Sequence, residues 1–317
     1  MNYIIIITGA TAVGKTSFSI QLAEKIGGEI INADIGSFYK PLTIGTAKPD
    51  WSDDAIPHHL FDYIDKPRDE TVVAFREQVQ ELCAKIWARG KTPIIVGGST
   101  LYIKSLLYRQ AHIPQLDQDE AMQIESMNRV DLYQELLLID PVRAAQIDPQ
   151  DRYRLERAIS IWRATGKQPS SFQVAFDPIA PFCFIEMIQD RKNLYERINQ
   201  RVEQMFIKGW MQEVETLSGT DWEPFLMRKK MMGYDRLLEI VKKNNDLDLE
   251  TIKDIQKSIR NYAKRQITFY KKLKKELADQ IQQKNEIGFI RECSLTLSDL
   301  SLYIKQLSVD LYKNFLS

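Results

Sequence analysis

Short apolar runs alternate along the chain with longer stretches in which apolar residues recur every three or four positions. The short runs are rich in isoleucine and valine and predict buried strands at residues 4–7, 29–34, 92–96 and 181–188. The stretches with helical periodicity lie between them and predict helices at residues 17–26, 71–89, 101–107 and 191–217. This alternation predicts an α/β fold in which helices flank a parallel sheet.

The pattern changes in the middle of the chain, where strand signals are absent and two helical patterns predict helices at residues 121–138 and 153–164. We therefore expect a small all-helical insertion domain. After it, a long helical pattern covers residues 251–277, and the last residues predict a short strand near Phe289 and a terminal helix. We expect four parts. The core is formed by residues 1–112 and 178–284, the helical insertion covers residues 113–177, and a C-terminal extension covers residues 285–317.

The turn after the first predicted strand fits the phosphate-loop pattern G-x-x-x-x-G-K-[ST], and a helix follows it. Glycine lets several backbone N–H groups point inward, the lysine adds a positive charge, and the helix directs its positive end at the anion. The expected phosphate-binding residues are Gly9, Ala10, Thr11, Ala12, Val13, Gly14, Lys15 and Thr16. A strand-to-helix turn without a ligand is the alternative, but strand, motif and helix together favour a P-loop NTPase-like sheet.

Asp34 ends the second predicted strand. Because the carboxyl ends of parallel strands face the ligand, we expect it beside the phosphate loop. Nucleotide kinases and NTPases place a magnesium-binding Asp after a later apolar strand, whereas the run at 94–96 ends in Gly97-Gly98. Asp34 is therefore free to accept a proton from an attacking group while diphosphate departs. Lys15, an arginine and Mg²⁺ would stabilise the leaving group.

Two polar pairs lie at other strand ends. Ser99 and Thr100 follow the glycine pair, where a ligand can approach the backbone closely, and a turn without function is the alternative. His58 and His59 are adjacent, and neighbours on a strand point to opposite faces. We therefore expect the histidines to pack or to form hydrogen bonds rather than to bind a metal together.

Charge is unevenly distributed, although the formal net charge is zero. Residues 225–275 contain 15 Lys and Arg against six Asp and Glu, whereas residues 112–160 contain five against ten. The helix predicted at 251–277 carries apolar and basic residues on different stripes, so it is a candidate face for a large anion. A solvent-facing stripe is the alternative.

Two arginine pairs lie on predicted helices. Arg197 and Arg201 are one turn apart and could clamp an anion, or they could pair with Glu196 or Glu203 on the surface. Arg154 and Arg157 share a helix face in acidic surroundings, where ordinary solvated charge is the alternative.

Three cysteines without metal-ligand spacing indicate reduced structural thiols. We see no signal peptide and no membrane span, so we expect a cytoplasmic protein.

Ten short segments resemble motifs of the tRNA dimethylallyltransferase family, and they occur in one consistent order along the chain. The segments that carry the resemblance are 9–16, 32–34, 44–49, 57–60, 96–98, 101–102, 148–158, 194–198, 232–234 and 262–266. The resemblance implies transfer of a dimethylallyl group from dimethylallyl diphosphate to N6 of adenosine 37, next to the tRNA anticodon, with release of diphosphate. It also implies the partners dimethylallyl diphosphate and the tRNA anticodon stem-loop, and a Mg²⁺ cofactor near Thr16. Since one tRNA per monomer needs no partner chain, we expect a monomer, and we expect no membrane contact because no apolar span is present.

The resemblance also implies roles for individual residues. Asp34 would be the base at N6, supported in catalysis by Lys15, Thr16, Ser99 and Thr100, and Arg197 and Arg201 would bind the diphosphate with the phosphate loop. The residues expected to contact tRNA are Asp34, Ser37, Tyr39, Lys48, Arg154, Arg157, Lys257, Arg260, Lys264 and Arg265.

The sequence departs from the family's usual pattern at three places, which affect base recognition rather than diphosphate binding. Ile35-Gly36-Ser37 replaces the usual Ser-Met-Gln, Gly97-Gly98-Ser99-Thr100 replaces Gly-Gly-Thr-Gly, and Arg152-Tyr153 replaces Pro-Gln. Three other functions are alternatives: an adenylate isopentenyltransferase acting on free AMP, ADP or ATP, a P-loop small-molecule kinase, and a tRNA-binding homologue with weakened catalysis.

Overall fold

A computed structural model describes residues 2–52, 55–111, 113–114, 116–172, 174–284, 288–294 and 300–316. The chain divides into two compact units, one formed by Met1–Leu107 and Pro178–Ser317 and the other by Tyr108–Asp177. The expected boundaries at residues 112 and 285 lie outside the described residues.

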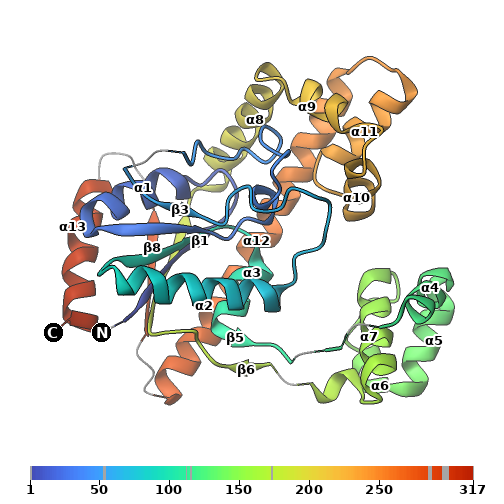
Figure 1. Cartoon of the computed structure of the whole chain (residues 1–317), viewed down its shortest axis with the longest axis horizontal. Helices are drawn as coiled ribbons and strands as arrows, with labels where there is room; N and C mark the ends of the chain where they lie inside the picture. Colours follow the sequence, from blue (N-terminus) through green and yellow to red (C-terminus); the bar gives the residue numbers. More distant parts are fainter. Residues whose placement is uncertain are drawn as a thin grey trace. The chain divides into compact units, whose positions relative to one another are not determined.

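A sheet of six parallel strands forms the centre of the first unit (Figure 1). In sheet order the strands are β3 (His58–His59), β2 (Gly28–Asn32), β4 (Thr92–Val96), β1 (Ile4–Gly9), β7 (Phe182–Ile188) and β8 (Gly288–Ser294). Each neighbouring pair is parallel, so β2, β4 and β1 end side by side at the same edge. Ligands bind at this edge in open α/β sheets.

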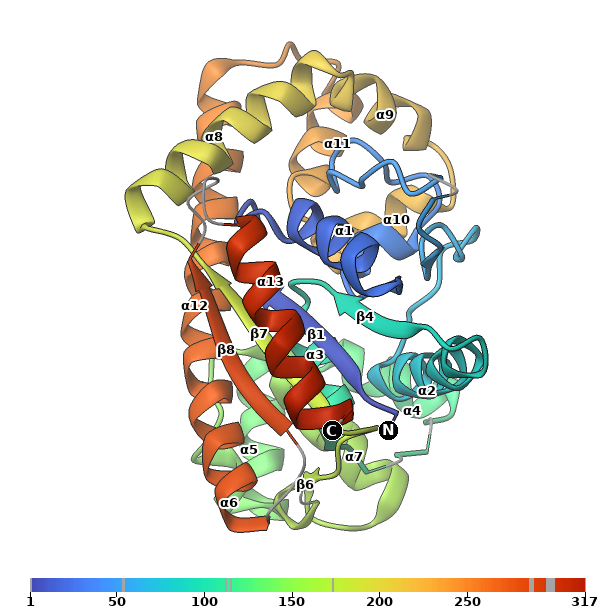
Figure 2. The same cartoon turned by 90° about the vertical axis from the view of Figure 1, so that its left-hand side faces the viewer.

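Helices cover both faces of the sheet (Figure 2). On one face lie α1 (Lys15–Ile26) and α13 (Leu300–Leu311), and on the other lie α2 (Val72–Ala88), α3 (Thr100–Leu107) and α12 (Leu249–Lys284). The remaining elements of this unit are η1 (Ile35–Phe38), α8 (Arg191–Ile207), α9 (Trp210–Leu217), α10 (Trp222–Lys229), α11 (Tyr234–Lys243) and η3 (Tyr312–Leu316). The α/β fold with a parallel sheet is therefore confirmed.

The second unit is helical apart from one short ribbon. Its helices are α4 (Gln118–Ser126), α5 (Arg129–Ile139), α6 (Pro141–Ala144), α7 (Arg152–Thr165) and η2 (Pro169–Ser171), and the antiparallel pair β5 (Tyr108–Arg109) and β6 (Ala175–Phe176) joins its two ends. It has its own core, formed by Ile124, Leu132, Leu136, Ala144, Ile147, Leu155, Ala158 and Ile159.

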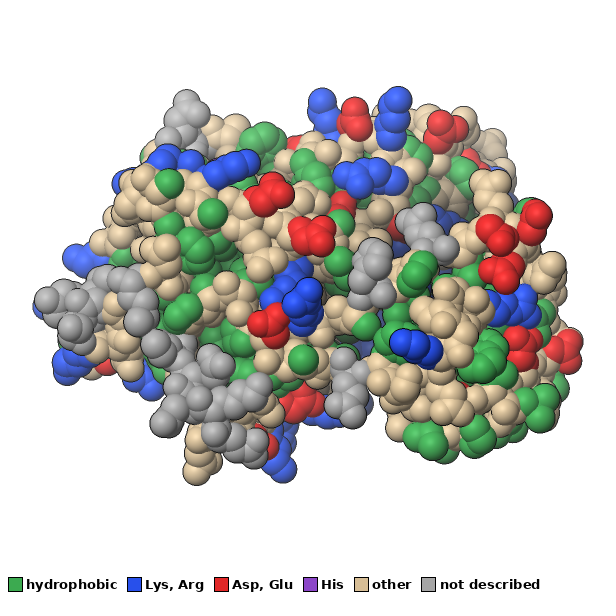
Figure 3. Space-filling view, turned by 60° about the horizontal axis from the view of Figure 1, so that its bottom comes forward, with side chains coloured by type: hydrophobic (Ala, Val, Ile, Leu, Met, Phe, Trp, Pro, Cys, Tyr) green, Lys and Arg blue, Asp and Glu red, His purple; other side chains and the backbone are tan. Residues whose placement is uncertain are grey.

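On the face drawn in Figure 3, basic side chains are interspersed with acidic ones, in keeping with the formal net charge of zero.

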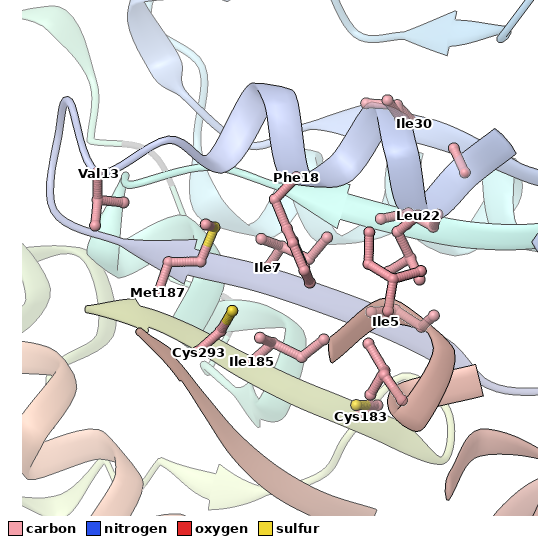
Figure 4. Close-up of a cluster of buried hydrophobic side chains, with 14 of the residues drawn as sticks. Ile5, Ile7, Val13, Phe18, Leu22, Ile30, Cys183, Ile185, Met187 and Cys293 are labelled. Atoms are coloured by element: carbon pink, nitrogen blue, oxygen red, sulfur yellow. The ribbon is translucent and has the colours of Figure 1, made fainter. Parts of the chain in front are cut away.

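Alternating side chains of β1 face the two helical layers, because successive residues of a strand point to opposite faces. Ile5 and Ile7 pack against Phe18 and Leu22 of α1, together with residues of β7 and β8 (Figure 4). All three cysteines are buried and free, as the sequence predicts. No helix among the described residues is both long enough and apolar enough to cross a membrane.

Three predicted elements differ from the observed ones. The helix predicted at 191–217 is two helices, because Gly209 has a φ of 95° and this left-handed conformation cannot continue a helix. The helix predicted at 121–138 is also two, because the side chain of Asn128 accepts a hydrogen bond from Asp131 N and starts α5. The strand predicted at 29–34 ends at Asn32.

The expected C-terminal extension belongs to the first unit. The strand predicted near Phe289 is confirmed as β8, which pairs with β7 along its full length. Helix α13 packs against α1, and its residues Ile304, Leu307 and Leu311 are buried in the same core as β1.

Candidate active site

The phosphate loop lies between β1 and α1 in a conformation that the sequence motif explains. Gly9, Ala12 and Gly14 have φ angles of 138°, 62° and 105°. A Cβ atom at Gly9 would lie 2.4 Å from the carbonyl oxygen of Met187, so a larger residue would not fit there. Gly14 caps the N-terminus of α1, whose first N–H groups and positive dipole end form an anion-binding site.

Lys15 folds back over this loop. Its Nζ donates hydrogen bonds to the carbonyl oxygens of Gly9, at 3.2 Å, and Ala10, at 3.1 Å. Burial lowers the pKa of Lys15, the negative charge of Asp34 opposes this effect, and the positive charge of Arg201 adds to it. A buried cation that is weakly compensated is a favourable place for a phosphate group.

Asp34 lies two residues beyond the end of β2 and, as expected, lines the same cavity as the phosphate loop. Its side chain and backbone are held from both sides. Its backbone N–H donates to Asn32 Oδ1 at 2.9 Å, and Asn32 Nδ2 donates to the carbonyl oxygen of Leu60, also at 2.9 Å. The N–H of Gly98, which follows β4, donates to Asp34 Oδ1. The carboxylate therefore has a fixed orientation at the ligand edge of the sheet.

Helix α8 brings two guanidinium groups to the phosphate loop. Arg197 Nε donates to the carbonyl oxygen of Ala12 at 2.9 Å. Arg201 lies 3.5 Å from Thr11 Oγ1 and donates to the carbonyl oxygen of Ala47 at 3.1 Å. Burial lowers the pKa of Arg201, and the charge of Asp34 opposes this effect. Both arginines are therefore placed for an anion, and neither forms an ion pair with Glu196 or Glu203 among the described residues.

These groups line one cavity of about 710 Å³. The residues predicted for the site that line it are Thr11, Ala12, Gly14, Lys15, Thr16, Asp34, Ser37, Ser99, Arg197 and Arg201. Apolar side chains from α8, α12 and the segment before α11 also line it, namely Ile198, Val202, Met205, Met231, Met232 and Ile259. The cavity thus combines an anion-binding wall with an apolar one, which suits a ligand that carries a phosphate group on an apolar chain.

Several residues expected at the site have other places in the structure. The side chain of Tyr39 is fully buried and packs edge-on against Trp222 and Phe225, so it is unable to contact tRNA. Lys48 is buried in an ion pair with Asp62 and donates to the carbonyl oxygen of Tyr39 at 2.9 Å. Both are structural residues of the loop after β2, and this corrects the expectation of tRNA contacts.

The other expected residues near the site are backbone or helix-end positions. Gly9, Ala10 and Val13 are buried residues of the phosphate loop that do not line the cavity. Thr100 begins α3 and does not line the cavity either. Its neighbour Ser99 does line the cavity, and the Ser99 hydroxyl accepts a hydrogen bond from Ile35 N at 3.0 Å.

Helix α12 supplies two site residues that the residue-by-residue prediction missed. Gln266 and Tyr262 line the cavity, and Gln266 is bonded to the phosphate loop. Burial and then the charge of Asp34 raise the pKa of Tyr262, so its hydroxyl stays protonated beside Ser99 and Gln266. The sequence feature that could have pointed to them is the segment 262–266, which belongs to the family pattern but has no chemistry that is recognisable by itself.

The metal-binding groups of the site are few. Among the described residues, no group of three or more His, Cys, Asp or Glu side chains is arranged to hold a metal ion. The adjacent histidines form separate hydrogen bonds, His58 Nδ1 with the carbonyl oxygen of Ile56 and His59 Nε2 with Glu29, each at 2.7 Å. The predicted packing and hydrogen-bonding role of this pair is confirmed.

The basic residues expected to contact tRNA are mostly exposed. Lys257, Lys264 and Arg265 are exposed on α12, whereas Arg260 is half-buried and donates to Asn199 Oδ1. In the second unit, Arg154 and Arg157 are exposed on α7. Arg154 also pairs with Asp151 at 3.1 Å.

A parallel sheet with a phosphate loop, two arginines and a carboxylate around one cavity defines a P-loop α/β protein with a site suited to a phosphorylated compound. A sequence model of the family described as IPP transferase matches residues 37–273. The chain is 38% identical to tRNA dimethylallyltransferase 1 of Citrifermentans bemidjiense, over 85% of this chain and 89% of that protein. It is 36% identical to the tRNA dimethylallyltransferase of Geobacter sulfurreducens, with the same coverage. The chain belongs to the IPP transferase family, as the sequence motifs predict.

Two solved structures are similar over nearly the whole chain. The tRNA isopentenylpyrophosphate transferase of Bacillus halodurans is 27% identical, with a TM-score of 0.64, and the match covers 99% of this chain and 98% of that one. A eukaryotic dimethylallyltransferase acting on tRNA is 25% identical, with a TM-score of 0.75, and the match covers 100% of this chain and 80% of that one.

Proposed function

We propose that this protein transfers the dimethylallyl group of dimethylallyl diphosphate to N6 of adenosine 37 in tRNA and releases diphosphate. One observation supports this more than any other. The Asp34 carboxylate lines the same cavity as the phosphate loop, Arg197 and Arg201. A carboxylate at this place can accept the proton of the group that attacks the bound compound.

In the proposed reaction, N6 forms a bond to the terminal allylic carbon while the bond from that carbon to the diphosphate oxygen breaks. The electron pair of the broken bond leaves with diphosphate, and the N6 proton moves to the Asp34 carboxylate. The phosphate-loop N–H groups, Lys15 and the two arginines stabilise the charge that develops on the leaving oxygen. The apolar wall of the cavity holds the five-carbon chain and limits access of water.

Mg²⁺ fits this site as a cation held mainly by the substrate. Thr16 is exposed on the first turn of α1 and lines the cavity, and its hydroxyl would be the ligand from the protein. Mg²⁺ keeps several water ligands and is usually bound through few protein groups together with substrate phosphates, so the diphosphate oxygens and water would supply most of its ligands here. When bound, it would neutralise part of the diphosphate charge.

Exposed cations favour tRNA over a free nucleotide as the acceptor. Lys257, Lys264 and Arg265 on α12 would bind stem phosphates, and Arg154 and Arg157 on α7 would bind the anticodon loop. Adenosine 37 would be turned out of its stack to reach Asp34, which costs less in a loop than in a duplex. Since one chain provides the whole cavity, we propose that a monomer is active.

The test is to incubate the purified protein with dimethylallyl diphosphate, Mg²⁺ and either unmodified tRNA with an A36-A37-A38 loop or free AMP. The tRNA is then digested to nucleosides, and both reactions are analysed by mass spectrometry for the N6-dimethylallyl product. We expect product from tRNA alone. Product from AMP alone would instead identify an adenylate isopentenyltransferase. Binding of tRNA without product would identify a homologue with weakened catalysis.

A further inference from the structure

Gln266 joins two loops of the active site that are far apart in the sequence. Its side chain is 2% exposed and projects from α12. Gln266 Oε1 accepts a hydrogen bond from the backbone N–H of Thr11 in the phosphate loop at 2.9 Å. Gln266 Nε2 donates to the carbonyl oxygen of Gly98 at 2.8 Å. One carboxamide therefore ties the diphosphate side of the cavity to the loop that follows β4.

The second of these loops also holds the base. Gly98 accepts from Gln266 through its carbonyl oxygen and donates from its N–H to Asp34 Oδ1. A Cβ atom on Gly98 would lie 2.5 Å from Gln266 Nε2 and 3.3 Å from Asp34 Oδ1. The three groups are packed so closely that a shift of Gln266 would displace Gly98, and a shift of Gly98 would displace the carboxylate.

On the basis of the function proposed above, we infer that Gln266 is a positioning residue that sets the Asp34 carboxylate relative to the diphosphate. The two reacting partners are held by different loops, and Gln266 fixes the distance between those loops. A carboxamide suits this place because it donates and accepts at once without adding charge beside Lys15, Arg201 and Asp34. Misplacing reacting groups by about 1 Å costs on the order of 100-fold in rate.

Helix α12 also contains a matched control. Gln256 is 8% exposed, and its Nε2 lies 3.3 Å from both the carbonyl oxygen of Asn199 and Glu203 Oε1. Gln256 does not line the cavity. Gln256→Leu and Gln266→Leu thus remove the same buried group from the same helix, but only Gln266→Leu breaks the link between the active-site loops.

The experiment compares wild type, Gln266→Leu and Gln256→Leu in kcat with tRNA, in Kd for dimethylallyl diphosphate and in melting temperature. We expect both variants to melt at lower temperature. Only Gln266→Leu should lose kcat, by on the order of 100-fold, with less than about a threefold change in Kd, which is under 1 kcal/mol. Equal kcat in the two variants would overturn the inference, because Gln266 would then contribute only to stability.

Gln266→Glu adds a readout that a purely structural role would not change. The introduced carboxylate cannot donate to Gly98 when it is ionised, whereas a protonated carboxyl group donates and accepts as the amide does. The activity of Gln266→Glu relative to wild type should therefore rise as the pH falls. A pH-independent ratio would count against the inference.

Amide hydrogen exchange separates this inference from the proposed function, since it requires no turnover. The N–H of Gly98 is not bonded to Gln266, so its exchange reports whether the link transmits position. We expect faster exchange at Gly98 in Gln266→Leu and unchanged exchange in Gln256→Leu. Unchanged exchange in both would refute the positioning role. Faster exchange combined with an inactive wild type would retain that role and refute the proposed function.

Discussion

The negative charge of Asp34 acts on two buried cations of the site, Lys15 and Arg201. Burial lowers the pKa values of Lys15 and Arg201, and the negative charge of Asp34 raises both. The two cations are adjacent to the loop whose N–H groups are expected to bind diphosphate. An anion that enters this site gains the attraction of both side chains in a region of low dielectric constant, where such attraction is strong.

The lowered pKa of Lys15 gives a testable pH dependence. A bound diphosphate favours the protonated lysine, so affinity should fall as the pH rises through the lowered pKa of Lys15, which is below the usual value of about 10.4. Lys15→Met should bind more weakly at neutral pH and should lack this alkaline decline. Calorimetry with dimethylallyl diphosphate at several pH values measures both effects. Parallel pH curves for the two proteins would contradict the role given to Lys15.

At the scale of elements, α9 holds the loop that positions Arg201. The carboxylate of Glu213 accepts hydrogen bonds from the backbone N–H groups of Thr43, Ile44 and Gly45 at 2.9, 2.7 and 3.1 Å. It also accepts one from the hydroxyl of Tyr234 at 2.6 Å. The same loop continues to Ala47, whose carbonyl oxygen binds Arg201. Helix α9 thus acts through this loop on the site that we propose for diphosphate.

We predict that Glu213→Gln destabilises the fold and weakens diphosphate binding. The amide has one acceptor oxygen and places an N–H₂ group against the loop donors, and bonds to a charged group contribute about 1.5–3 kcal/mol each. Thermal unfolding and calorimetry with dimethylallyl diphosphate measure the two effects. Glu215→Gln, an exposed position on the same helix, is the control. If both variants bind diphosphate as wild type does, the loop does not position Arg201.

In the helical unit, Asp140 performs a similar role for two elements. Its fully buried carboxylate accepts from the N–H of Arg143, at the start of α6, and from the N–H of Ser170, at 2.9 and 2.6 Å. Burial would raise the pKa of Asp140, but these hydrogen bonds exceed that effect and lower it. The carboxylate is therefore stabilised in the folded state relative to the unfolded one.

This lowered pKa determines how the stability of the helical unit depends on pH. The stabilisation from Asp140 is present above the unfolded-state pKa of about 3.9 and is lost as the pH falls through the lower folded-state pKa. Asp140→Ala should cost about 2 kcal/mol at neutral pH, from the lost cap and hydrogen bond. Amide exchange in α5 and α7 measures the local unfolding free energy. If the local unfolding free energy of the wild-type helical unit stayed constant down to a pH of about 2, Asp140 would not contribute in this way.

Local patterns predict elements, whereas contacts between distant segments have no local signal. Four consecutive isoleucines are too few for a helix and apolar on both faces, so β1 was predictable from residues 4–7 alone. The placement of Asp34 at the site was also predictable, because parallel strands present their carboxyl ends to the ligand. The bonds of Gln266 to Thr11 and Gly98 span 255 and 168 residues, and no periodicity encodes them.

Loops were the least predictable parts for the same reason. Tyr39 and Lys48 lie among polar residues and glycines typical of an exposed binding loop, yet the aromatic side chains of α10 and the carboxylate of Asp62 bury both. The break at Gly209 was missed because the apolar periodicity continues through it. Only the left-handed φ reveals the change of direction.

At the scale of the whole molecule, the cavity lies at the edge of the sheet, and the exposed cations that we propose to bind tRNA lie outside the cavity. The excess of basic residues at 225–275 includes Lys257 and Lys264, which are exposed on α12 and do not line the cavity. This separation means that tRNA affinity and diphosphate affinity should respond to different substitutions.

The double variant Lys257→Gln/Lys264→Gln tests this separation. It should weaken tRNA binding and reduce the slope of log K against log salt concentration by about 1.5, because each phosphate contact contributes about 0.7–0.9. The Kd for dimethylallyl diphosphate should stay as in wild type. Titrations of tRNA at several salt concentrations measure the slope, and an unchanged slope would place the tRNA on another surface.

The most direct test of the account is the single-turnover rate of N6-dimethylallyladenosine formation by Asp34→Asn, with the Kd for dimethylallyl diphosphate measured alongside. Asparagine keeps the shape of the side chain and an acceptor for Gly98 N–H, but it cannot accept the N6 proton. We predict a loss of about 10²- to 10⁴-fold in rate with little change in diphosphate affinity. A rate near that of wild type would show that Asp34 is not the base.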